Sequence, residues 1–168
     1  IKNMHKKVLS EQVLYYGDVK MPKGWEINPL NLCKQLFDSL YHEKDCHYCK
    51  DWDKLNNYIR EHIRIKHNLV LETKDSWANA YIPNEKTKTL NHVDPMNLAD
   101  SADLVLLYGI NTLDCKIIIN FDDNKEKGKV WNIDLKQNKF VMFPSTNTYS
   151  IKNNQRSSLN FIQTITYE

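Results

Sequence analysis

The sequence predicts an α+β protein that is mainly β, in which two N-terminal helices pack on one sheet of a β-sandwich or jelly roll. Two observations predict this fold. Apolar residues recur at helical spacing between residues 29 and 63, and from residue 69 the apolar pattern changes to period two. Two helices followed by about eight short strands are typical of helices that cover one face of a β body.

Capping residues mark the start of each expected helix. Asn28 is suited to an N-cap and Pro29 to the first helical position, and an apolar stripe follows over residues 32–41. Asp51 is expected to cap the second helix. The apolar face of that helix is formed by Trp52, Leu55, Ile59 and Ile63. Such stripes indicate packing against a core.

Short strands are expected both before the helices and throughout residues 69–168. The first covers residues 13–16 and ends in a turn at Gly17-Asp18. Clusters of Asn, Asp, Gly and Pro separate the others. These are Leu69–Glu72, Trp77–Ile82, Leu104–Tyr108, Lys116–Phe121, Val130–Asp134, Phe140–Phe143, Thr148–Ile151 and Ser158–Tyr167.

Length and composition favour one domain over residues 1–168, with residues 1–68 supporting a β core at 69–168. The 23 basic and 21 acidic residues give a formal charge of +2, without the basic stripe of a nucleic-acid-binding protein. No apolar run reaches the length of a membrane span, and the first residues lack a signal-peptide core. We therefore expect a cytoplasmic or otherwise intracellular protein that binds neither nucleic acid nor membrane.

Four cysteines include one C-x-x-C pair, Cys46 and Cys49, with His42 nearby. A structural zinc site usually needs a second pair of ligands at similar spacing. No such pair follows in the sequence, and Cys33 falls inside an expected helix. Reduced thiols are therefore the favoured interpretation, with a metal or redox site as the alternative.

The run Thr89–Pro95 contains the most informative pair of residues, His92 and Asp94. Side chains two apart in an extended strand point to the same face. An imidazole and a carboxylate would then converge as two of the three ligands that hold non-haem Fe(II). The alternative is structural, because Asp94 before a proline also favours a turn that its own carboxylate stabilises.

Three further stretches, in this order, give the chain a resemblance to the 2-oxoglutarate/Fe(II) dioxygenase superfamily. Trp77-Ala78-Asn79-Ala80-Tyr81 precedes the H-x-D pair, Phe143-Pro144-Ser145 follows it, and an R-x-S pair opens the last strand at Arg156 and Ser158. The likeness is to small oxygenases with a single double-stranded β-helix domain and covers roughly residues 75–166. No motif is specific alone, but their order and spacing together are.

The resemblance implies a double-stranded β-helix that holds Fe(II) and 2-oxoglutarate. In that family the R-x-S pair holds the cosubstrate carboxylate, a role that would fall to Arg156 and Ser158 here. Arg156 could instead pair with a surface carboxylate. Tyr81 and Tyr108 are candidate cosubstrate contacts by strand position, or core aromatics whose hydroxyls are satisfied.

One position departs from the family pattern, because the distal histidine ligand falls on Tyr149. His92 is the last histidine in the chain. A neutral phenol, with a pKa of about 10, is a poor ligand unless the metal drives its deprotonation. Three outcomes stay open: iron held by His92, Asp94 and Tyr149, iron held weakly without Tyr149, or a site that has lost the metal.

Three functions follow from these alternatives. The first is an oxygenase with an altered triad that hydroxylates an unknown substrate. The second is a non-catalytic jelly-roll module for a protein partner or homo-oligomer. The lysine- and asparagine-rich composition indicates an AT-rich coding bias, such as many viruses and some bacteria have, so a virion component is one form that this module would take. The third is a sugar- or nucleotide-binding groove lined by Trp77, Trp131 and Tyr149.

Overall fold

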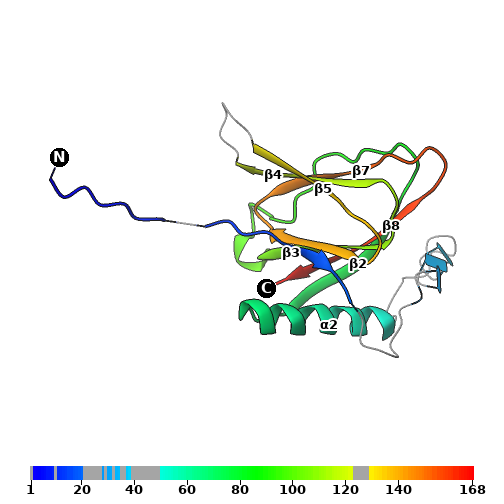
Figure 1. Cartoon of the computed structure of the whole chain (residues 1–168), viewed down its shortest axis with the longest axis horizontal. Coiled ribbons are helices and arrows are strands. Elements are labelled where there is room, and N and C mark those ends of the chain that lie inside the picture. Colours follow the sequence, from blue (N-terminus) through cyan, green and yellow to red (C-terminus); the bar gives the residue numbers. More distant parts are fainter. Residues whose placement is uncertain are drawn as a thin grey trace.

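A computed structural model describes residues 2–9, 11–20, 28, 30–31, 33–34, 37–38, 50–122 and 129–168. One helix and eight strands are defined within these residues (Figure 1). They are β1 Tyr15–Asp18, α2 Lys50–His67, β2 Thr73–Tyr81, β3 Leu104–Asn111, β4 Cys115–Asp122, β5 Lys129–Asp134, β6 Lys139–Pro144, β7 Thr148–Asn153 and β8 Asn160–Tyr167. A short 3-10 turn, Leu98–Asp100, follows the H-x-D run.

The strands form two antiparallel sheets that face each other, so the protein is mainly β with a jelly-roll fold (Figure 1). The larger sheet has the order β1-β6-β3-β8-β2, and the smaller has the order β5-β4-β7. Residues 86–90 run beside β7 through two isolated bridges, Lys86 with Lys152 and Leu90 with Tyr149. The expected jelly roll is thus confirmed.

Period-two alternation along the strands of the larger sheet separates two cores. On β8, Phe161, Ile165 and Tyr167 face α2, whereas Ile162 points between the sheets. The core between the sheets also contains side chains from both of them, including Val105, Leu107, Ile117, Ile119, Val141, Phe143, Tyr149 and Ile151. The interior of the jelly roll is therefore filled largely by apolar side chains.

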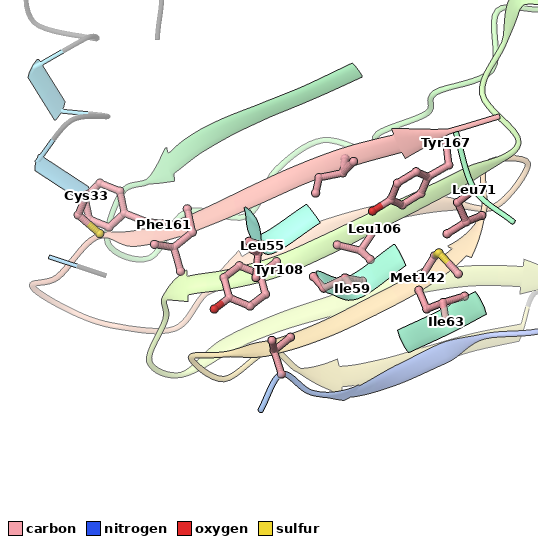
Figure 2. Close-up of a cluster of buried hydrophobic side chains, with 13 residues drawn as sticks. Cys33, Leu55, Ile59, Ile63, Leu71, Leu106, Tyr108, Met142, Phe161 and Tyr167 are labelled. Atoms are coloured by element: carbon pink, nitrogen blue, oxygen red, sulfur yellow. The ribbon is translucent and has the colours of Figure 1, made fainter. Parts of the chain in front are cut away.

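Helix α2 covers the outer face of the larger sheet. Leu55, Ile59 and Ile63, spaced by four residues, are buried against Leu106 and Met142 (Figure 2). These are three of the four residues of the apolar face expected from the sequence, and the side chain of the fourth, Trp52, lies outside the described part of the chain. The helix also carries a buried polar contact, in which the Tyr167 hydroxyl donates to Oδ1 of Asn56 at 2.8 Å.

Three local expectations were wrong. Residues 69–72 do not form a strand of their own, because β2 begins at Thr73. Gly17-Asp18 lies within β1 rather than in a turn. Asp51 lies inside the first turn of α2, which starts at Lys50.

Two other expectations fall mainly outside the described residues. The first helix is one of them, so the described residues contain one of the two expected helices, α2. At its expected start, Oδ1 of Asn28 accepts from the amides of Leu30 (3.1 Å) and Asn31 (3.3 Å), as an N-cap does. Cys46 and Cys49 also lie outside. None of the helices in the described part is long and apolar enough to cross a membrane.

Candidate functional site

The bridge between Leu90 and Tyr149 positions the centre of the site. Two backbone hydrogen bonds of 2.7 and 3.1 Å join these residues, so the chain leaves the bridge beside β7 and reaches His92 two residues later. There Nε2 of His92 lies 2.6 Å from the hydroxyl of Tyr149, and the two rings stack with centroids 5.5 Å apart. The sequence prediction that His92 and Tyr149 lie together is supported by this contact.

Burial makes both members of this pair neutral. Tyr149 is 1% exposed, and desolvation raises the pKa of its phenol well above the usual range, with a further contribution from Tyr81. Desolvation lowers the pKa of His92 below 6.5. The phenol therefore donates its hydrogen bond to an unprotonated Nε2, and the remaining imidazole proton sits on Nδ1.

A pocket of about 380 Å³ opens beside His92, and we call it the mouth pocket. The ring of Trp77 forms one wall and lies 5.5 Å from the His92 ring, centroid to centroid. The lining residues are Lys74, Asp75, Trp77, His92, Asp94, Asn97, Asp100, Ser101, Ala102 and Thr166. Three carboxylates against one lysine give the mouth an acidic character.

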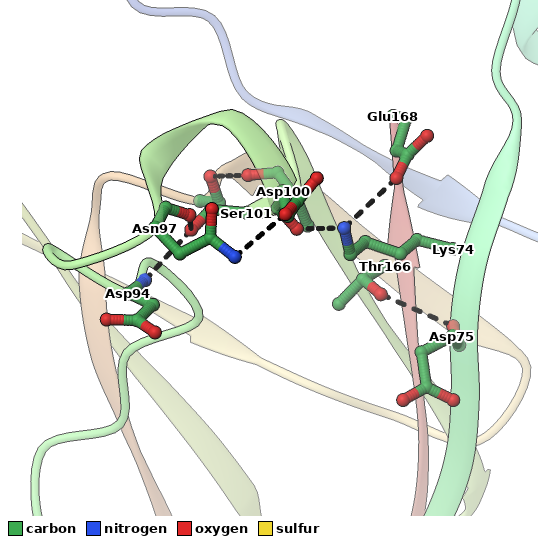
Figure 3. A network of polar contacts seen from close by, with 10 residues as sticks. Lys74, Asp75, Asp94, Asn97, Asp100, Ser101, Thr166 and Glu168 are labelled. Atoms are coloured by element: carbon green, nitrogen blue, oxygen red, sulfur yellow. Dashed lines mark hydrogen bonds and ion pairs between the residues drawn. The ribbon is translucent and has the colours of Figure 1, made fainter.

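Asp94 lines the mouth pocket, but one oxygen of its carboxylate already accepts a hydrogen bond within its own loop. Oδ1 of Asp94 accepts from the amide of Met96 at 2.9 Å, which is the turn expected before Pro95. The Asp94 amide in turn donates to Oγ of Ser101 at 2.9 Å, and Asn97 donates to Asp100 at 2.8 Å (Figure 3). These bonds fold residues 94–101 into one polar loop.

Lys74 lies at the rim of the mouth pocket, beside the same loop. Nζ of Lys74 donates to the carbonyl of Asp100 and pairs with Oε1 of Glu168 at 3.0 Å (Figure 3). This ties the start of β2 to the loop and to the end of the chain. The lysine therefore offsets only part of the negative charge of the mouth.

The residues expected to bind the cosubstrate are not brought to this mouth. Arg156 and Ser158 are exposed in the turn between β7 and β8, before β8 begins, whereas Thr166 at the other end of β8 lines the pocket. Tyr108 faces α2, on the opposite side of the larger sheet from Tyr149. Its hydroxyl donates to Asn138, and burial raises its pKa to about 12.

Tyr81 does point between the sheets, near Tyr149. It is buried, and desolvation raises its pKa to about 12. Its position inside the jelly roll fits the place that the resemblance gives it, but apolar side chains such as Ile117 and Ile162 fill that interior. The aromatic groove expected from Trp77, Trp131 and Tyr149 is not assembled, because Trp131 lines a different pocket with Gln12–Leu14.

The residues present do not fit Fe(II) and 2-oxoglutarate as the resemblance implies. Among the described residues, no three His, Cys, Asp or Glu side chains are placed to hold a metal ion together. The third candidate ligand, Tyr149, is a phenol kept neutral by burial and engaged by His92. Arg156, the candidate anchor of the cosubstrate, points out of the β7–β8 turn into solvent.

Sequence reasoning missed most of the mouth. Ser101 and Asn97 were not singled out, because hydrogen bonds within a loop such as theirs leave no distinct motif in the sequence. Thr166 was not singled out because it reaches the pocket from β8, a distant segment of the chain. Only the turn signals at Asp94-Pro95 and Asp100-Ser101 hinted that this stretch forms a compact loop. Trp77 was recognised as part of a strand motif, but not as the neighbour of His92.

Comparison with solved structures shows that the chain shares its fold with prolyl hydroxylases. A prolyl-4-hydroxylase from Pseudomonas putida matches with a TM-score of 0.60 and 12% identity, over 92% of this chain and 84% of that one. A prolyl hydroxylase from Trichoplax adhaerens, solved with a hypoxia inducible factor peptide, matches with a TM-score of 0.58 and 14% identity, over 83% of this chain and 77% of that one.

At such identities the likeness establishes the fold alone. No protein-family model and no curated protein matches the sequence.

Proposed function

We propose that this chain is a non-catalytic protein built on the oxygenase fold, in which Tyr149 stands where the family has its distal histidine ligand. The observation that carries this proposal is the 2.6 Å hydrogen bond between the Tyr149 hydroxyl and Nε2 of His92. This bond occupies Nε2 of His92, one of the two ring nitrogens through which a histidine can bind a metal. The jelly roll then serves as a stable body for binding or assembly rather than for hydroxylation.

Metal binding would have to overcome two costs that the environment of Tyr149 imposes. The phenol would have to lose a proton that burial holds on it, and the hydrogen bond to His92 would have to break. Asp94 would also share its carboxylate with the turn at Met96. These costs support a closed pair over a metal site.

An assembly role is supported by the N-terminal residues. Residues 2–9 are exposed and extend away from the body (Figure 1). Met4, Val8 and Leu9 are among the exposed large apolar side chains, with Leu9 89% exposed. In the assembly role that we propose, a protein partner or a second copy of the chain covers these apolar side chains, as in a virion component.

The second candidate function is an oxygenase with an altered triad, acting on an unknown substrate. The position of His92 and Asp94 on one pocket favours it, as do the prolyl hydroxylases with the same fold. It would place Fe(II) on His92 and Asp94, with Tyr149 or water completing the site, and would require Arg156 and Ser158 to turn inward to the 2-oxoglutarate carboxylate.

Anaerobic titration of the purified protein with Fe(II) and 2-oxoglutarate, followed by succinate measurement in air, separates the two candidates. The non-catalytic proposal predicts no cosubstrate-dependent spectral change and no succinate above the protein-free rate. Stoichiometric iron binding with succinate release would overturn it.

The titration above predicts an absence of iron binding and turnover, so a pair of variants at position 149 adds a test that predicts a measurable gain. Tyr149→His supplies a second imidazole beside His92 and should raise Fe(II) affinity by at least about tenfold. Tyr149→Phe removes the same hydroxyl, and with it the hydrogen bond to His92, without adding a ligand, so it should raise Fe(II) affinity less than Tyr149→His does. Equal iron binding by both variants would contradict the view that position 149 is the missing ligand.

A further inference from the structure

A groove of about 470 Å³ lies between strand β1 and helix α2, and nothing in the proposed function uses it. We call it the β1–α2 groove. Its floor and walls include Tyr15 and Phe140 from the sheet side, and Ile63 and Lys66 from the helix. The groove is on the α2 side of the larger sheet, so it is separate from the mouth pocket on the His92 side.

Strand β1 offers an unpaired backbone edge to this groove. It is the last strand of the larger sheet and pairs only with β6 within the described residues. Val19 donates to the carbonyl of Asn138 at 2.8 Å, and this bond continues the β1–β6 register. Because ladder bonds alternate along an antiparallel pair, Gly17 also bonds to β6, whereas Tyr16 and Asp18 direct their amides and carbonyls outward.

A side chain of helix α2 already forms a hydrogen bond with one outward-facing backbone carbonyl at the end of this strand edge. The alternation that turns Tyr16 and Asp18 outward also turns Lys20 outward, and its carbonyl accepts a hydrogen bond from the hydroxyl of Tyr58. At the other end, the ring of His67 packs edge-on against Tyr15 with centroids 4.8 Å apart. The helix and the strand edge thus form the two sides of the groove.

The charge of the β1–α2 groove indicates which kind of peptide would bind there. Lys20 and Lys66 line it with the imidazoles of His62 and His67, against one carboxylate, Asp18. The surplus is positive, so carboxylates on an incoming peptide would meet complementary charge. The apolar floor would accept aliphatic side chains between those carboxylates, since side chains of a strand alternate.

We propose that the β1–α2 groove binds an extended acidic peptide of a partner protein, which adds as a strand to the free edge of β1 beside α2. Backbone bonds to Tyr16 and Asp18 would hold the chain, and Lys66 would pair with one of its carboxylates. This inference goes beyond the proposed function and holds whether or not iron binds at the mouth.

Fluorescence anisotropy with a labelled Glu-Val-Glu-Val-Glu-Val peptide tests the proposal on the full chain. We expect saturable binding of this peptide, and binding of Lys-Val-Lys-Val-Lys-Val that is at least about tenfold weaker. The acidic peptide with every backbone amide N-methylated keeps its charge but lacks backbone donors, and it should lose binding to a similar extent.

Two protein variants form a matched pair on the same helix. Lys66→Glu reverses an exposed charge in the groove and should weaken the acidic peptide by about fivefold. Lys54→Glu makes the same change at an exposed position of α2 outside the groove lining and should leave affinity within about twofold. If both variants weakened peptide binding equally, the overall charge of the protein would explain the attraction, and the assignment of the site would be overturned.

Hydrogen exchange of the wild-type protein reports on the strand edge itself. Saturating acidic peptide should slow amide exchange at Tyr16 and Asp18, while Gly17, already bonded to β6, should change little. The proposal is overturned if neither outward amide is protected, if the lysine peptide binds equally well, or if no binding is detected at about 1 mM peptide.

Discussion

The hydrogen bond between His92 and Tyr149 predicts a measurable cost when the hydroxyl is removed. Tyr149→Phe keeps the buried ring, including its 5.1 Å edge-on packing against Phe143, and deletes only the donor to Nε2. A neutral hydrogen bond contributes about 0.5–1.5 kcal/mol. His92 is half-buried and borders the mouth pocket, so water can replace part of the bond, and we expect a loss of about 1 kcal/mol.

The same pair predicts how stability depends on pH. Burial lowers the pKa of His92 in the folded protein below its ordinary 6.5, so the unfolded chain takes up the proton first. This contribution to stability is fully present above pH 6.5 and is lost as the pH falls through the folded pKa. His92→Ala removes it, so the stability difference between wild type and this variant should shrink on acidification.

Urea unfolding followed by tryptophan fluorescence measures both effects at pH 7.5 and pH 5.5. The control is Tyr16→Phe, which removes a hydroxyl from a side chain that is 60% exposed and should change stability by less than about 0.5 kcal/mol. In a His92→Ala background, Tyr149→Phe should cost almost nothing further. An unchanged cost in that background, or no cost at all in wild type, would refute the coupling.

Three further predictions concern the body of the fold. Gly109→Ala would place a Cβ 2.4 Å from the carbonyl oxygen of Lys136 and should cost about 3 kcal/mol, whereas Gly17→Ala, with its nearest neighbour at 3.6 Å, should cost less than about 1 kcal/mol in the same urea titration. Asn153, 0% exposed, donates to three backbone carbonyls, so Asn153→Ala should cost about 2–4 kcal/mol and lower the midpoint of thermal unfolding; a midpoint equal to wild type would contradict this. Burial raises the pKa of Cys115 to about 12, so iodoacetamide should label it at pH 8 only as fast as the protein unfolds, and rapid labelling of the native state would count against this environment.

Alternation made the β core predictable from the sequence, and its failures are local. The strands β3 to β8 fall where period-two patterns and turn residues placed them. The apolar pattern of residues 69–72 predicted a strand that does not form. Leu71 is buried in the core beneath α2, but it lies before β2, so its apolar character reflects burial and not strand formation. The sequence predicts a turn at Gly17, but pairing with Phe140 of β6 at the sheet edge makes it a strand residue.

The sequence predicted that His92 and Tyr149 lie close together, but it did not predict which way the side chains of the other expected site residues point. The resemblance to the oxygenase family placed Tyr149 beside His92, and these two residues, 57 positions apart, are in contact. It could not tell that Arg156 belongs to an exposed turn, because the R-x-S pattern carries no information on where β8 begins. Likewise Tyr108 shares a strand with inward residues, but alternation turns it toward α2.

The state of the His92 imidazole in the presence of metal tests the central claim most directly. Nitrogen-15 NMR of the wild-type protein under anaerobic conditions would follow His92 Nε2 during titration with Fe(II). We predict a neutral ring that accepts from Tyr149 and a resonance that neither shifts nor broadens at equimolar Fe(II). Selective paramagnetic broadening of His92 at that ratio would show that iron binds at the mouth, and it would contradict the closed pair.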